Sequence, residues 1–434
     1  MATKILAHPM DDKRKASVVT LSFDIAGDSD PVSEECQYYY WHCKTYGESI
    51  VSTNSKRFNR IIHSSNRRRR GGGGDVDSFQ ISINTENAGS ATNTFVLPAV
   101  GGPFDVTDWG DGQSDLAVSG TQTHDYGVGN AGTYTVTINK IVNAFQPCRF
   151  AAGGDKLKIL DIVQWGNIEW DSMYRSFFQC SNMDITATDV PIITAAATNW
   201  EYAFSNCSSV TSIPLFDTSA CTNFRSTFAT MTSLTAFPRI DVSSATSLIS
   251  TFSNLYYVNE FSTIDTSTIT NFSSTWYALG TSSSMTEPPL FDTSAAVTFA
   301  SVFSHCSTFT SIPAFDLSNA TNTNRAFTNC TSLVTVLLMD LSKSTNVDYM
   351  FQTCALITSL PLFNLASIVS ATGFLSSSTI DTADYSAILI LMEDNNQNTG
   401  GTFNGGSSIP NVAGIVAKTA LVDDHSWTIT DGEP

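Results

Sequence analysis

The sequence predicts a mainly β protein whose central part is a solenoid, and three observations predict it. An aromatic residue followed three residues later by Cys or another mostly apolar residue recurs nine times, at steps of 27, 24, 24, 24, 27, 24, 24 and 23 residues. A ladder of Asp residues keeps the same period, and a ladder of Asn, Ser or Thr follows each Asp by six residues. Three ladders with one period indicate about nine stacked coils of 24 residues, each burying its apolar face against its neighbours.

The ladders run through the middle of the chain. The aromatic ladder consists of Phe177, Phe204, Phe228, Phe252, Trp276, Phe303, Phe327, Phe351 and Phe374, and its partners are Cys180, Cys207, Met231, Leu255, Leu279, Cys306, Cys330, Cys354 and Ser377. The Asp ladder consists of Asp217, Asp241, Asp265, Asp292, Asp316 and Asp340, continued by Asn364. The third ladder consists of Asn223, Ser247, Asn271, Thr298, Asn322 and Asn346.

Each coil has a predicted internal order. Apolar and polar residues alternate over 209–214, 233–238 and 308–313, which predicts short half-buried strands. The Pro that ends each of them has no N–H for a ladder hydrogen bond, so the strand stops there. The Asp that follows favours an Asx-type turn or a helix cap, and residues 223–228 and their equivalents predict one short helical turn. The longer step after Trp276 places three additional residues in 280–288, as a bulge on the surface.

The repeat Phe-x-x-Cys-x-x-Leu-x-x-Ile-Pro-x-Phe-Asp-x-Ser-x-x-Thr-Asn, over about residues 170–378, resembles the leucine-rich repeats of BspA-like surface proteins. The resemblance implies a leucine-rich-repeat-type solenoid with a sheet on one side. It also implies a place on a cell or virion surface, where such proteins bind hosts, matrix or other cells. We assign the solenoid to residues 146–378, with a first coil whose buried strand face comes from Leu157, Ile159 and Ile162.

Residues 76–145 predict a different domain. Residues 79–83 alternate, residues 108–112 (Asp-Trp-Gly-Asp-Gly) predict a tight turn, and His124-Asp-Tyr and Gly132-Thr-Tyr-Thr-Val follow. This order resembles a PKD-like domain, which implies a β-sandwich that acts as a spacer or contacts proteins and glycans. Asp108 and Asp111 are weak candidates for calcium ligands. The alternative is that they only shape the turn, and we predict no cofactor.

The two ends of the chain depart from the repeat. Residues 379–434 predict an α/β cap, with helices over 384–393 and 412–422, a turn over 400–406 and a closing strand over 427–432. Residues 1–75 predict a small β-rich docking module, with strands over 19–25 and 38–42. Arg67, Arg68, Arg69 and Arg70, followed by four glycines, form a linker that is either a solvated loop or a contact to an anionic surface.

Charge separates the two parts of the chain. With 22 Lys and Arg against 40 Asp and Glu the net charge is −18, but residues 1–74 carry +4 and residues 75–434 carry −22. Such an acidic protein is a poor general nucleic-acid binder. No apolar run approaches the roughly 18 residues of a membrane span, so no membrane insertion is expected. The first residues show no secretory signal, which leads us to expect assembly without export.

The candidate chemistry is sparse. Ladder cysteines share their position with Met and Leu, so we predict buried thiols rather than disulfides. Cys36, His42, Cys43 and His63 leave open a zinc site, a Cys36–Cys43 disulfide or neither. The Asp ladder is interpreted as turn-forming rather than as a calcium row or a catalytic cluster. No singular carboxylate pair of the kind a glycosidase needs stands out, and we predict no enzyme.

These features together predict a structural or adhesive virion surface protein of a tailed phage: a fibre, decoration or tail-tip protein. It would dock to other virion proteins by its N-terminus and bind a host cell-surface protein or glycan through the solenoid, as a homo-oligomer. A bacterial cell-surface adhesin, and a polysaccharide-degrading tail enzyme, are the alternatives. The predicted contact residues are Tyr256, Tyr257, Tyr277, Ser283, Met285 and Glu287; Trp276 is expected in the core because it replaces a ladder Phe.

Overall fold

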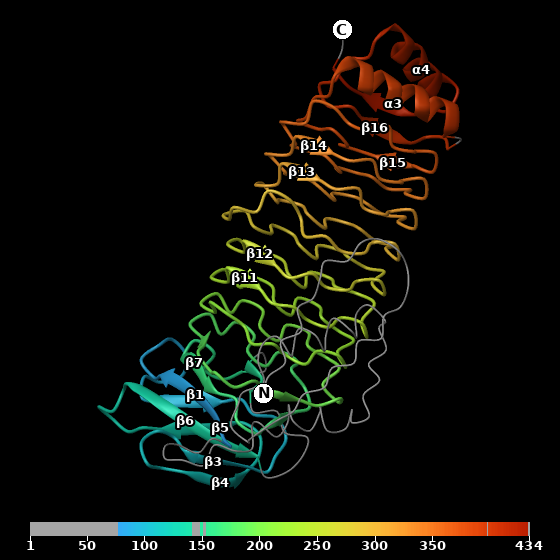
Figure 1. Ribbon diagram of the computed structural model, residues 1–434. Helices are drawn as coiled ribbons and strands as arrows, with labels where there is room; N and C mark the ends of the chain where they lie inside the picture. Colours follow the sequence, from blue (N-terminus) through green and yellow to red (C-terminus); the bar gives the residue numbers. More distant parts are fainter. Residues whose placement is uncertain (1–76, 141–147, 151–152, 397, 433–434) are drawn as a thin grey trace, which may run out of the picture. The chain divides into compact units, whose positions relative to one another are not determined.

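The computed structural model describes residues 77–140, 148–150, 153–396 and 398–432. This part of the chain is mainly β, with few helices, and is built around a β-solenoid of about 11 turns (Figure 1). The sequence predicted about nine.

The strands before the solenoid are β1 (Phe79–Asn84), β2 (Thr94–Leu97), β3 (Phe104–Asp108), β4 (Asp115–Val118), β5 (Gln122–Asp125) and β6 (Thr133–Lys140). Alternate residues of β1 are buried, as predicted. Strands β4, β3, β6 and β1 lie in that order in one antiparallel sheet, and β2 pairs with β5 in another.

The first sheet continues into the solenoid across the domain boundary that we placed at residue 145. Strand β7 (Ile159–Gln164) pairs antiparallel with β1, and β9 (Asp184–Ile185) pairs parallel with β7. Residues 75–434 accordingly form one compact unit. In the first coil Ile159 and Ile162 are fully buried, as predicted, whereas Leu157 is only half-buried and the adjacent Lys158 is fully buried.

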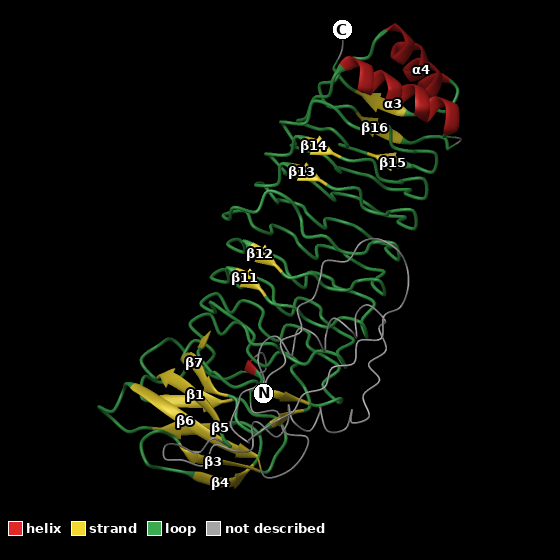
Figure 2. Ribbon diagram, viewed as in Figure 1, coloured by secondary structure: helices red, strands yellow, loops and turns green. Residues whose placement is uncertain are grey.

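The strands of the coils are shorter than predicted. They are β8 (Glu169–Trp170), β10 (Ile192–Ile193), β11 (Ala236–Phe237), β12 (Glu260–Phe261), β13 (Ser311–Ile312), β14 (Thr335–Val336) and β15 (Ser370–Ala371). Pairs of them are parallel, and residues 209–214 form no strand. Figure 2 therefore draws most of the solenoid as loop. Pro238 and Pro313 end β11 and β13, because proline has no N–H to donate to the strand pairing.

The predicted helical turn before each ladder aromatic is also wrong. Residues two before and two after the aromatic have positive φ, as at Ser226 (51°) and Thr230 (62°), which a right-handed helix does not allow. The amides of Ser226, Phe228 and Thr230 instead donate to carbonyls of the next coil at 3.0, 3.0 and 2.8 Å. Each coil thus satisfies its turn amides through its neighbour.

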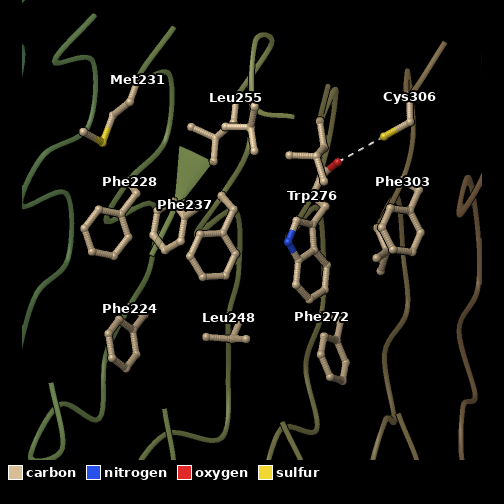
Figure 3. Close-up of a cluster of buried hydrophobic side chains, with 14 of the residues drawn as sticks. Phe224, Phe228, Met231, Phe237, Leu248, Leu255, Phe272, Trp276, Phe303 and Cys306 are labelled. Carbon is tan, nitrogen blue, oxygen red and sulfur yellow. Dashed lines mark hydrogen bonds between the residues drawn. The ribbon is translucent and has the colours of Figure 1, made fainter. Parts of the chain in front are cut away.

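The ladder aromatics form one continuous buried column (Figure 3). Ring centroids of successive members from Phe177 to Phe351 lie 5.3 to 6.2 Å apart, and all of these pairs are stacked. Trp276 occupies the column, as expected, between Phe252 and Phe303. This column, which the repeat predicted, is the centre of the core.

The last step of the ladder needs a correction. The amide of Phe327 donates to Met350, the residue before the next ladder aromatic, and the amide of Phe351 donates in the same way to Phe374. Leu375, 24 residues after Phe351, therefore holds the ladder position instead of Phe374. Phe374 meets Phe351 edge-on, at an interplanar angle of 86°.

The C-terminal segment closes the stack. Helices α3 (Thr382–Asn395) and α4 (Val412–Asp423) agree with the prediction, and their N-caps Asp381 and Asn411 accept from the amides of Asp384 and Gly414. Strands β16 (Thr402–Asn404) and β17 (Thr428–Thr430) continue the parallel pairing of β15, so the predicted turn at 400–406 contains a strand. The two helices lie over this end of the coils in Figure 1.

Candidate binding surface

The Asp ladder forms the turns that the sequence predicted. Asp217, Asp241 and Asp316 accept the amides of Ser219, Ser243 and Ser318 at 3.2, 2.9 and 3.1 Å. The three serine hydroxyls donate to the same carboxylates at 2.6, 2.6 and 2.7 Å. The bonds from Ser318 hold the pKa of Asp316 below its ordinary value. The carboxylates are thus engaged in the backbone of each coil.

The ladder cysteines are buried free thiols, as predicted. Burial raises the pKa of Cys354 to about 12, so its thiol stays protonated and can donate a hydrogen bond. The Sγ atoms of Cys207, Cys306, Cys330 and Cys354 donate to the carbonyl of the aromatic one coil earlier, at 3.0 to 3.3 Å; Figure 3 shows the bond from Cys306 to Trp276. Ser378 makes the same bond with Oγ, to Phe351 at 2.8 Å. The ladder position three residues after each aromatic therefore suits a small side chain that donates a weak hydrogen bond, such as Cys or Ser, as well as an apolar side chain.

The weak calcium candidates are engaged in the turn after β3. Oδ1 of Asp108 accepts the amide of Gly110 at 2.7 Å, and Oδ1 of Asp111 accepts that of Gln113 at 2.9 Å. Burial raises the pKa of Asp111, but the hydrogen bonds from His124 and Gln113 outweigh it and hold that pKa below its ordinary value. These contacts favour the turn-shaping alternative. Within the described ranges no three His, Cys, Asp or Glu side chains are grouped so as to hold a metal ion.

The three predicted contact tyrosines lie on neighbouring coils. Tyr277 is half-buried and its ring lies 4.8 Å from that of His305. Burial raises the pKa of Tyr277, with a further contribution from nearby Tyr256. Tyr257 is 49% exposed. Tyr277 and His305 thus form an aromatic contact between neighbouring coils, of which sequence reasoning identified the tyrosine but not the histidine.

The imidazole of His305 is held on both sides. Nδ1 is 2.9 Å from Oγ of Ser304, and Nε2 is 2.9 Å from the side-chain amide of Asn329. The amide nitrogen is a donor, so Nε2 accepts and Nδ1 carries the proton that points to Ser304. Burial lowers the pKa of His305, which keeps the ring neutral at neutral pH.

The bulge at 280–288 packs back on the preceding coil. The amide of Ser282 donates to the carbonyl of Tyr256 at 2.9 Å. Ser283 closes the turn by donating to the carbonyl of Gly280 at 2.9 Å, and Met285 is half-buried against the core. Glu287 reaches the next coil, where it accepts from the hydroxyl of Ser311 at 2.6 Å. Ser283 and Met285 therefore support the bulge, while Glu287 and Tyr257 are exposed on the surface.

Sequence analysis did not identify two columns of surface residues, although the residues of each column stand at a fixed spacing from the ladder aromatics. The residue two before each aromatic is Arg or Tyr at both ends of the solenoid and Ser between them. The other column is exposed and β-branched throughout: Thr198, Thr222, Thr246, Thr270, Val297, Thr321, Thr345 and Val369. Its hydroxyls donate to the preceding coil, as Thr345 does to the carbonyl of Thr321 at 3.2 Å.

Several candidates lie outside the described residues. They are the linker residues Arg67, Arg68, Arg69 and Arg70 and the possible zinc or disulfide residues Cys36, His42, Cys43 and His63.

Part of the repeat region is similar to a known protein family. Residues 198–288 and 246–362 match the family described as "Mycoplasma protein of unknown function, DUF285". This match and the β-solenoid together fit a BspA-like repeat protein. No curated protein and no solved structure shows significant similarity to the chain. Among the described residues, no helix is long and apolar enough to cross a membrane.

Proposed function

We propose that the protein is a non-enzymatic surface-binding protein whose solenoid contacts a host cell-surface protein or glycan. One observation supports the proposal: the residues that recur on every coil have structural roles in the turns and in the core. Asp241 and its equivalents accept hydrogen bonds within the turns, and Cys330 and its equivalents are buried and donate to the preceding coil. Residues that vary from coil to coil, Tyr257 and Glu287 among them, are exposed on the surface. A surface of this kind suits recognition by contact rather than reaction in a pocket.

The proposal extends to a virion of a tailed phage. Residues 1–75 dock to other structural proteins of the particle, residues 76–145 act as a PKD-like spacer, and the acidic solenoid faces the host as part of a homo-oligomer. The charge difference between residues 1–74 (+4) and 75–434 (−22) supports the division into docking and display parts. Such particles would be assembled in the host cytoplasm.

Two measurements test this function. Deletion of residues 1–75 is expected to abolish incorporation into particles while the remaining chain still binds host cells. Retention on particles would refute the docking assignment, and localisation to the envelope of uninfected bacteria would favour a cellular adhesin.

Incubation of the chain with host capsule or envelope glycan is expected to give binding without release of reducing sugar. Steady release of reducing ends would instead identify a polysaccharide-degrading enzyme.

A further inference from the structure

The last helix of the cap is apolar on two sides. Gly414, Ala417 and Leu421 of α4 are buried, and a Cβ at Gly414 would lie only 2.8 Å from Cβ of Ser386, so this side packs closely on α3. The other side of α4 is exposed and carries Val412, Ile415, Val416, Thr419 and Val422. These five residues are called the α4 stripe below.

The α4 stripe has the spacing of a helix that packs against another helix. Val412, Ile415, Thr419 and Val422 follow one another at steps of 3, 4 and 3 residues, which is the repeat of a coiled-coil seam. The hydroxyl of Thr419 donates to the carbonyl of Ile415 at 2.9 Å and is thus satisfied within the helix. Val412 and Val416 are 81% and 66% exposed. Large apolar side chains grouped in this way mark a contact surface rather than a solvated helix face.

The strand of the same coil has an open edge. In the part of the chain that the structure describes, β17 ends its sheet and pairs only with β16. Helix α3 precedes β16 and α4 precedes β17, and the two helices pack side by side as the two strands do (Figure 1). The side of α4 away from α3 and the open edge of β17 therefore face out of the same end of the solenoid. Such an edge offers backbone N–H and C=O groups to a further strand.

The charges at the ends of α4 indicate which partner fits. The helix has no acidic residue in its first turn and no basic residue in its last, and Asp423 and Asp424 are exposed at its C-terminus. This is the reverse of what the helix dipole favours within one helix. A second copy of α4 lying antiparallel would place its carboxylates beside the N-terminus of the first copy, and the first would do the same in return. Parallel copies would instead bring like carboxylates together.

The acidity of the chain favours contact at this end over contact along the sides. Residues 75–434 carry a net charge of −22, so copies that approach side by side repel each other. The α4 stripe has no charged residue, and the nearby Lys418 is paired with Asp431 of its own chain at 2.6 Å. An uncharged apolar contact at the cap keeps most of the acidic surface of the two copies apart.

We propose that two copies of the chain join at their C-terminal caps through a two-fold axis. The α4 stripe of one copy packs antiparallel on that of the other, and β17 pairs antiparallel with its copy in the same interface. The contact is small, because α4 is only about 18 Å long, so association in the micromolar range is expected. The inference rests on the proposed function, whose homo-oligomer it specifies, and it leaves the sides of the solenoid free for a host ligand.

Sedimentation equilibrium of the full chain from about 1 to 100 μM tests the interface. The wild-type chain is expected to form dimers in this range. Ile415→Glu/Val422→Glu is expected to associate at least tenfold more weakly, because the interface would desolvate an unpaired carboxylate at each position. The matched control Leu290→Glu, at a residue 71% exposed on a coil, is expected to stay within twofold of wild type. Equal melting temperatures at a dilution where wild type is monomeric would show that the variants are folded.

A second double variant tests the antiparallel order. Asp423→Asn/Asp424→Asn removes carboxylates that are unfavourable at the C-terminus of their own helix, so the monomer is expected to melt no lower than wild type. Its dimer is nevertheless expected to dissociate at least threefold more readily, with a difference that shrinks as salt is added. Unchanged or tighter association would contradict the antiparallel arrangement.

Three outcomes overturn the inference: a wild-type chain that stays monomeric, association that Ile415→Glu/Val422→Glu retains, and equal loss in Leu290→Glu. Binding of a monomeric wild-type chain to phosphatidylcholine vesicles, lost in the double glutamate variant, would assign the α4 stripe to a lipid surface instead. Binding of the fluorescently labelled chain to whole host cells is measured alongside. A monomeric wild type that binds host cells would refute this interface but leave the proposed surface-binding function standing. A dimer that binds no host cell would refute that function and leave the interface.

Discussion

Truncation of one ring in the aromatic column tests the packing of the solenoid. Phe228 is fully buried and stacks between Phe204 and Phe252, with centroids 6.1 and 6.2 Å away; its edge meets Phe237 at 5.1 Å. Replacement of a buried Phe by Ala costs about 3–5 kcal/mol in transfer and cavity terms. The column leaves little room to collapse, because the coils on both sides are tied to each other by backbone hydrogen bonds. We therefore expect Phe228→Ala to fall near the upper end of that range.

Urea unfolding followed by tryptophan fluorescence measures this cost, since Trp276 lies in the same column. Phe228→Leu keeps most of the volume and is expected to lose about 1–2 kcal/mol. The exposed control Tyr257→Ala is expected to change the unfolding free energy by less than about 0.5 kcal/mol. A loss below about 1 kcal/mol in Phe228→Ala would show that the ring is not in a packed column and would refute the reasoning.

The remaining predictions concern groups that support the coils. Cys330→Ser is expected to cost less in urea unfolding than Cys330→Ala, because a hydroxyl keeps the bond to the Phe303 carbonyl, as Ser378 does one coil beyond Cys354. Asp241→Ala is expected to lose about 1 kcal/mol in the same assay, and Asp241→Asn much less, since the amide oxygen still accepts. Lys158 is fully buried and donates to the carbonyls of Ala91 and Thr94 at 2.9 and 2.8 Å, so Lys158→Met is expected to destabilise by about 3–5 kcal/mol; a loss under 1 kcal/mol would contradict this. NMR titration of His305 is expected to give a pKa below the ordinary value of 6.5, because burial disfavours the charged imidazolium. The unfolded state then binds the proton more readily, so this contribution to stability is complete above pH 6.5 and falls as the pH drops from 6.5 through the lower folded pKa.

Periodicity predicted the parts of the fold that every coil repeats. The aromatic column, the buried thiols and the Asx turns follow from needs common to all coils, so their residues recur at one spacing. Helices α3 and α4 were also predicted, from the segments 384–393 and 412–422, and the structure adds that Asp381 and Asn411 cap their N-termini.

Other features depend on neighbours that the sequence pattern does not identify. The segment before each aromatic was predicted as one short helical turn, but its amides, such as that of Ser226, donate to the next coil instead. The sequence analysis assigned Phe374 to the ladder because it is aromatic, whereas the backbone hydrogen bonds show that Leu375 holds that position. The pairing of β7 with β1 joins segments about 80 residues apart.

The binding surface was predicted only in part for the same reason. Tyr277 stands out as an aromatic residue in the sequence, but its neighbour His305 lies one coil further along. Arg149 and Arg175 both stack on the ring of Tyr174, and no local motif marks these contacts.

Hydrogen exchange of the full chain, read by mass spectrometry with overlapping peptides, tests the stack of coils most directly. The amides of Phe228, Phe303 and Phe351, like their equivalents, donate to the next coil and are predicted to exchange slowly, so that protection recurs about every 24 residues from coil to coil up to the cap at α3. Protection confined to a few coils, or spread without that period, would contradict a continuous solenoid closed at its end.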